Sequence, residues 1–148
     1  MSVDVTVETV IQRPVDTVAA YAADPSNAPE WYANIDSIEW LTEPKIETGA
    51  KVAFVARFLG RRLEYTYDLV EVAPDERLVM RTAQGPFPME TTYTWTSTGD
   101  GSTRMTLRNR GEPAGFSKLT GWLMRPAIRR ANRKDLARLK ARLESRQG

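Results

Sequence analysis

The chain of 148 residues carries 21 lysines and arginines against 19 aspartates and glutamates, and it contains no cysteine and no histidine. A chain of this length can bury the core of one domain. Because it has no cysteine and no histidine, it cannot form disulfides, a thiolate nucleophile, an imidazole metal ligand or a serine–histidine–aspartate triad. We therefore expect no metal site and no cofactor and, because neither a long apolar run nor a signal-peptide pattern occurs, a cytoplasmic protein without a transmembrane segment.

The first part of the chain predicts a strand, a short helix and an aromatic corner. Residues 3–11 alternate apolar and polar side chains, which is typical of a half-buried strand. Pro14 suits the first turn of a helix, and the apolar positions after it recur at helical spacing until Pro25. A helix of about two or three turns should therefore lead into a corner that carries Trp31 and Tyr32.

The middle of the chain predicts six further strands with short connections. Gly60-Arg61 and Asp100-Gly101 mark tight hairpin turns. The expected strands cover residues 35–42, 50–59, 62–72, 77–83, 90–97 and 102–110. Connections of this length favour antiparallel pairing throughout.

From about Phe116 the apolar spacing becomes helical and continues almost to the end of the chain. A helix of this length would reach roughly 45 Å, and we expect Gly121 and Pro126 to bend it or to split off its first two turns. One antiparallel sheet with a long terminal helix is an α+β domain, and a sheet that curls around the helix leaves a cavity between them.

Several segments resemble a known family in their order and spacing. They are "RPVDTVAAYAADPSNAPEW", "FLGRRLEYTYDLVEVAPDERLVMRTAQGPF", "TTYTWTSTGDGSTRMTL" and "GEPAGF". Together they resemble the polyketide cyclase/dehydrase-like group of the START-related (SRPBCC, birch-pollen-allergen-like) helix-grip superfamily. The resemblance implies one domain over residues 1–148, in which a curved seven-stranded antiparallel sheet wraps around a long C-terminal helix, with short helices between the first two strands.

Members of this superfamily bind lipids, hormones or polyketides, and only some of them catalyse a reaction, so the fold alone does not choose a function. By the same resemblance Trp31 helps to close one end of the cavity and counts among the candidate ligand-binding residues. The competing interpretation is that Trp31 only packs in the core. Tyr32 could line the mouth.

Extending the alternation of the strands gives a candidate concave face. From the strands we expect Trp40, Phe54, Phe58, Tyr65, Tyr67, Met80, Tyr93, Trp95, Met105, Leu107 and Asn109, and from the helix Phe116, Leu119, Thr120, Leu123 and Ile128. Such a lining suits a flat or greasy ligand in a cavity of roughly 300 to 1,000 Å³, and a smaller space would count as core.

Without histidine, a catalytic group in this cavity must be of another type. The candidates are Tyr65, Tyr67, Tyr93 and Asn109. Three charged residues also lie on predicted strands, where we expect them on the solvated convex face: Arg57, Glu64 and Arg81. Any of these three that points inward would become a catalytic or anion-binding candidate.

The terminal helix is strongly basic, with ten lysines and arginines from Ser117 onward against Asp135 and Glu144. We interpret this as a solvated outer face; the alternatives are a contact with a membrane surface, RNA or an acidic protein. Nucleic acid is not favoured, because the strands lack an aromatic RNA-binding platform.

The leading hypothesis is binding of a small hydrophobic or aromatic ligand, lipid-like or polyketide-like. The alternatives are a polyketide cyclase, aromatase or dehydratase, and an interaction module that acts through the basic helix.

Overall fold

The computed structural model describes residues 3–58, 60–84, 88–111 and 118–145, with the backbone alone at 58, 83–84 and 118–124. Its strands pair into one antiparallel sheet in the order β1-β7-β6-β5-β4-β3-β2. They are β1 (Val3–Ile11), β2 (Ile35–Trp40), β3 (Lys51–Phe58), β4 (Arg61–Ala73), β5 (Arg77–Gln84), β6 (Met89–Ser97) and β7 (Thr103–Gly111).

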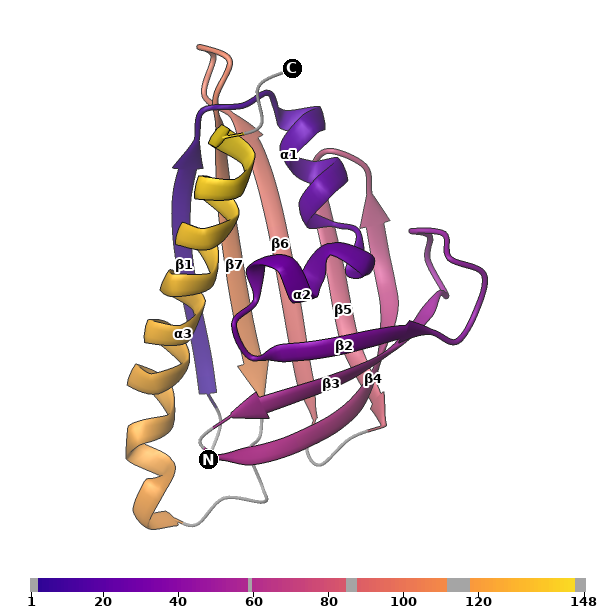
Figure 1. Cartoon of the computed structure of the whole chain (residues 1–148), viewed down its shortest axis with the longest axis vertical. Helices are drawn as coiled ribbons and strands as arrows, with labels where there is room; N and C mark the ends of the chain where they lie inside the picture. The colour runs from indigo at the N-terminus through magenta and orange to yellow at the C-terminus, as the bar shows by residue number, and fades with distance from the viewer. Residues whose placement is uncertain (1–2, 59, 85–87, 112–117, 146–148) are drawn as a thin grey trace.

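The sheet is strongly curved, so that β2 and β3 run across the direction of β1, β7 and β6 (Figure 1). The long strand β4 makes the change of direction. Its register with β5 shifts between Thr66 and Tyr67 and again between Leu69 and Glu71. Because irregular pairing of this kind bends a strand and increases its twist, β4 can belong to both halves of the sheet.

Three short helices connect β1 to β2: α1 (Val15–Ala22), the 3-10 helix η1 (Pro25–Asn27) and α2 (Ala28–Trp31). Pro14 occupies the N-cap of α1, and the Asp24 carboxylate accepts the backbone N–H of Ser26 at 2.9 Å to cap η1. Trp31 ends α2 and is fully buried.

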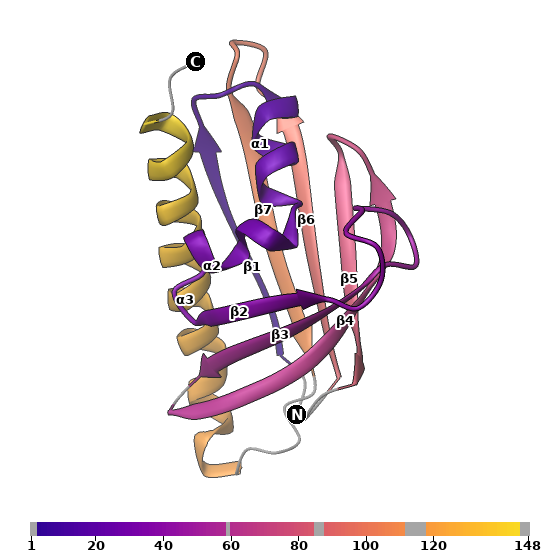
Figure 2. The same ribbon diagram turned by 45° about the vertical axis from the view of Figure 1, so that its right-hand side comes forward.

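The C-terminal helix α3 (Lys118–Ser145) lies lengthwise against β1, and the sheet curls toward it (Figures 1 and 2). Leu136, Leu139 and Leu143 of α3 are almost completely buried, as is Ile11 of β1. Helical spacing places these leucines on one face, and their burial attaches the second half of α3 to the sheet.

This architecture confirms the predicted α+β helix-grip fold with seven antiparallel strands. The helix α3 runs as one helix across Pro126, so its first turns are not split off, and a bend at Gly121 and Pro126 stays a prediction. Strand β2 ends at Trp40 and not at residue 42, because the side chain of Thr42, not its backbone, accepts the N–H of Lys51. Among the described residues, no helix is both long and apolar enough to cross a membrane.

Candidate functional site

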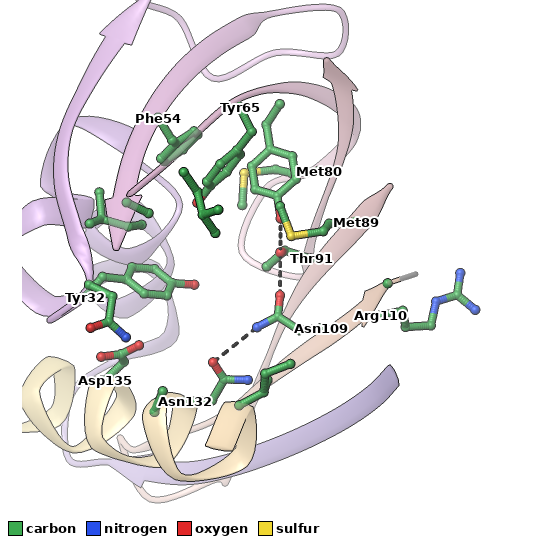
Figure 3. A pocket seen from close by; sticks show the side chains of 18 of the residues that line it. Tyr32, Phe54, Tyr65, Met80, Met89, Thr91, Asn109, Arg110, Asn132 and Asp135 are labelled. Atoms are coloured by element: carbon green, nitrogen blue, oxygen red, sulfur yellow. Dashed lines mark hydrogen bonds between the residues drawn. The ribbon is translucent and has the colours of Figure 1, made fainter. Parts of the chain in front are cut away.

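A predominantly apolar pocket of about 160 Å³ lies between the concave face of the sheet and α3 (Figure 3). Phe54, Tyr65, Tyr67 and Met80 line it from β3, β4 and β5, and Ile128 lines it from α3. These positions follow the inward alternation of the strands and the inner face of the helix. The curvature of the sheet therefore brings side chains from distant parts of the chain to one space.

The volume of the pocket is below the expected range, and the reason lies in the packing of its aromatic rings. Phe54 and Tyr65 stack with their ring centroids 5.4 Å apart and an angle of 7° between the planes. Tyr67 meets both rings edge-on, with centroids 5.5 and 5.1 Å away. The three rings thus fill part of the space that the curvature creates. The expectation of a larger cavity is wrong, and the size criterion set from the sequence assigns a space of about 160 Å³ to the core.

The predicted ligand-binding residues fall into three groups. The pocket is lined by Phe54, Tyr65, Tyr67, Met80, Tyr93, Asn109 and Ile128. The core outside the lining takes Trp31, Trp95, Met105 and Leu107, while Trp40 is half-buried and packs against it. The remaining side chains lie outside the described parts of the structure: Phe58, Phe116, Leu119, Thr120 and Leu123.

Two of the core residues, Trp31 and Trp95, are associated with the short helices. Trp95 is on β6, the strand that α1 contacts, and Trp31 itself belongs to α2. The ring of Trp31 lies 4.1 Å from that of Tyr32 and 5.8 Å from that of Tyr93, measured between centroids. Trp31 is not among the residues that line the pocket, and the alternative reading as core packing fits its full burial; it supports two tyrosines that do line the pocket.

Four polar side chains form a hydrogen-bonded relay along one wall of the pocket. The Tyr67 hydroxyl is 2.7 Å from Thr91 Oγ1, which donates to Asn109 Oδ1 at 2.6 Å. Asn109 Nδ2 then donates to Asn132 Oδ1 of α3 at 3.2 Å (Figure 3). The relay joins the sheet to the helix across the pocket wall.

A second polar pair lies at the α2 side of the pocket. The hydroxyls of Tyr32 and Tyr93 are 2.6 Å apart. Burial raises the pKa of both phenols, and it raises the pKa of Tyr67 to about 12. All three phenols therefore keep their protons at neutral pH.

Asp135 of α3 contributes a carboxyl group to the same part of the pocket (Figure 3). Its side chain is buried, and its Oδ1 accepts the backbone N–H of Ala33 at 3.1 Å. Burial raises the pKa of Asp135 to about 6, although the Ala33 N–H and the charge of Arg138 oppose the rise. In a chain without histidine, Asp135 is thus a group that can take up or release a proton near neutrality.

Thr91, Asn132 and Asp135 were not among the predicted site residues. Thr91 lies two positions before Tyr93 on β6, so the alternation of the strand would have placed it inward. Asn132 and Asp135 follow Ile128 by four and seven residues, which puts them on the inner face of the helix. Because asparagine and aspartate are polar, the sequence favours placing Asn132 and Asp135 in solvent. Only their helical spacing from Ile128 could have identified them as pocket residues.

A family profile described as polyketide cyclase / dehydrase and lipid transport matches residues 2–144. The chain belongs to this family. No curated protein matches it.

Three solved structures that share the fold align over nearly the whole length of both chains. An aromatase/cyclase, Zhui, from Streptomyces sp. R1128 is 15% identical with a TM-score of 0.82, covering 99% of this chain and 96% of that chain. A START superfamily protein from Mycobacterium smegmatis is 14% identical with a TM-score of 0.82, and the alignment covers 96% of this chain and 97% of that protein. A protein from Thermus thermophilus is 20% identical with a TM-score of 0.79, and the alignment again covers 96% of this chain and 97% of that protein.

The charged strand residues of this family member face the solvent, as expected. Each is more than half exposed at its side chain and forms a surface ion pair: Arg57 with Asp36, Glu64 with Arg62, and Arg81 with Glu90. Arg57 borders the rim of the pocket, but its guanidinium is held by Asp36 at 2.9 Å. None of the three is therefore an inward catalytic candidate.

Part of the positive charge on α3 attaches the helix to the rest of the domain. Arg138 donates to the Glu30 carbonyl oxygen at 3.3 Å, and Lys140 donates to the Val10 carbonyl oxygen at 2.7 Å. Arg142 pairs with the Glu30 carboxylate at 3.4 Å. Several cations of the helix thus have internal partners, which supports the interpretation of a structural and solvated face.

Within the described part of the chain, no cluster of three acidic side chains could hold a metal ion.

Proposed function

We propose that this protein binds a small, largely apolar ligand of about one ring in the pocket between its sheet and α3. The observation that carries the proposal is the pocket itself, about 160 Å³ in volume and walled mainly by aromatic and aliphatic side chains. Well-packed domains contain few voids larger than a water molecule, and an apolar cavity of about 150 Å³ can bind benzene. The family description, which names cyclases, dehydrases and lipid transport, supports the apolar character of the ligand but not its small size.

The volume sets the size of the proposed ligand. A lipid tail or a multi-ring polyketide needs more space than a single ring, so the pocket favours a smaller molecule than we expected from the resemblance. The stacked pair Phe54 and Tyr65 offers a flat surface to such a ring.

Filling the pocket is expected to abolish this binding. Ala131 lines the pocket from α3, so the Ala131→Leu substitution places a larger side chain in the space. We expect the affinity for toluene, measured by titration calorimetry or by NMR shifts, to fall by at least about tenfold, because leucine competes for the same apolar surface.

Ala137 provides the matched control, because it is exposed on the same helix. The Ala137→Leu variant should bind toluene as the parent does. Equal affinities of the two variants, or a parent protein that does not bind toluene saturably, would place the ligand site elsewhere.

A second candidate function is acid–base catalysis, which is favoured by the position of Asp135. Its carboxyl group borders the pocket, and burial brings its pKa to about 6. A carboxylate in an apolar site can take a proton from a bound ligand, while the phenol of the Tyr32–Tyr93 pair that accepts from the other keeps its own O–H to stabilise a developing oxyanion. This combination would suit a cyclase or dehydratase.

The base can be tested with acetophenone in D2O, because a base that removes a methyl proton forms the enolate, and return of a deuteron to carbon is followed by NMR as hydrogen–deuterium exchange. We expect the rate to rise as the pH increases through about 6 and to fall by about a hundredfold or more in the Asp135→Asn variant. A rate that the substitution leaves unchanged would remove Asp135 as a base and leave ligand binding as the function.

A further inference from the structure

One fully buried polar atom in the pocket wall, Asn132 Nδ2, has no hydrogen-bond partner among the described residues. The side chain of Asn132 lines the pocket and is buried, with 5% of the residue exposed. Its Oδ1 accepts from Asn109, but its Nδ2 has no hydrogen-bond partner among the described residues. A buried N–H that has lost its water is unfavourable unless it donates to something else.

The relay fixes which end of the Asn132 amide stays free. Thr91 Oγ1 lies 2.6 Å from Asn109, a distance typical of a hydroxyl donating to an oxygen and short for an amide N–H donating to a hydroxyl. The single proton of Thr91 is then used on Asn109 Oδ1, so Tyr67 must be the donor to Thr91. Asn109 consequently presents its Nδ2 to Asn132 Oδ1, which leaves the N–H groups of Asn132, a residue of the pocket lining, without an acceptor.

The charges around the pocket restrict what these N–H groups can bind. Asp135 lies three residues away on the same helix face and borders the same space, so it disfavours an anionic ligand when it is ionised. The described cations of the lining, Arg57 and Arg110, are held in ion pairs by Asp36 and Glu90. A neutral acceptor fits this setting better than a carboxylate.

We propose that the ligand is a small aromatic carbonyl compound whose oxygen accepts a hydrogen bond from Asn132 Nδ2 while its ring lies against the apolar wall. This inference rests on the proposed ligand-binding function and adds the chemical class of the ligand and the residue that selects it. Asn132 is a specificity-determining residue in this scheme, and Tyr67, Thr91 and Asn109 position it.

The test compares two probes of nearly the same shape, acetophenone and α-methylstyrene, in which a carbonyl oxygen is replaced by a methylene group. Titration calorimetry at pH 7 gives both affinities for the parent protein and for Asn132→Leu. We expect the ratio of the acetophenone affinity to the α-methylstyrene affinity to fall by about three- to tenfold in the variant, because leucine cannot donate to the carbonyl.

Two further variants keep the test decisive. Ile128→Val alters the apolar wall without touching the relay, so it should change both affinities together and leave the ratio unchanged. Thr91→Val removes the hydroxyl that orients the amides, so the ratio should fall in the same direction as in Asn132→Leu, and this variant gives the answer if Asn132→Leu does not fold.

The outcomes separate this inference from the function on which it rests. If both probes bind and their ratio is the same in the parent, Asn132→Leu and Thr91→Val, ligand binding stands and the role of Asn132 is overturned. If neither probe binds to the parent protein, the proposed function fails and the inference fails with it.

Discussion

The Asp135→Asn variant is expected to be more stable than the parent protein at pH 8, by about 3 kcal/mol. Burial makes the charged form of Asp135 unfavourable in the folded protein, which is why its pKa rises from an ordinary value of 3.8 to about 6. The folded state therefore binds the proton more tightly than the unfolded state does. Between about pH 4 and pH 6 the unfolded state has lost this proton while the folded state keeps it, so folding takes up a proton and the parent protein loses stability as the pH rises through this range.

Asparagine has no charge to bury, and its side-chain oxygen can still accept the N–H of Ala33. The gain should therefore be present at pH 8 and should shrink to below about 1 kcal/mol at pH 4, where the folded parent is already protonated. Urea unfolding of both proteins at the two pH values measures this difference. Glu47→Gln, on an exposed loop, is the control and should change stability by less than about 0.5 kcal/mol at either pH.

A gain that is the same at pH 4 and pH 8 would show that ionisation of Asp135 is not its source. A loss of stability at pH 8 would show that the carboxylate is well satisfied in the folded protein. The expected result instead describes a side chain that weakens the fold at neutral pH, which is typical of a residue retained for function.

The Trp31→Ala variant is expected to lose about 3 to 5 kcal/mol of unfolding free energy, because its side chain is fully buried and a large cavity would remain. Its ring packs on Tyr32 and Tyr93, which ties the short helices to the sheet. Urea unfolding at pH 7 measures the loss. Trp40→Ala is a matched control, since Trp40 is only half-buried and should cost less than half as much.

If Trp31→Ala cost no more than Trp40→Ala, the region around α2 would have to be loosely packed. Trp31 would then belong to an extension of the pocket, as the resemblance to the family first suggested, and not to the core.

The sheet could be predicted from the sequence because its signals are local. The alternation of residues 3–11 appears directly as the alternating burial of β1, and the hairpin at Gly60 joins β3 to β4. The same alternation correctly placed Phe54, Tyr65 and Tyr67 on the concave side. A strand reveals its two faces through a period of two, whatever its neighbours are.

The volume and the polar groups of the pocket could not be predicted in this way. The volume depends on how Phe54, Tyr65 and Tyr67 stack against each other, which is a property of three strands together. Asn132 and Asp135 have helical spacing that points inward and polarity that points outward, and only the tertiary structure decides between the two. The relay needs atomic distances across β4, β6, β7 and α3.

A crystal structure of the protein with acetophenone would test most directly whether the space between the sheet and α3 is a ligand site. We expect the aromatic ring in the pocket beside Phe54, Tyr65 and Ile128, with the carbonyl oxygen about 3 Å from Asn132 Nδ2. A pocket that stays closed by its own side chains at saturating acetophenone, with the molecule bound only on the outer surface, would contradict the proposed function.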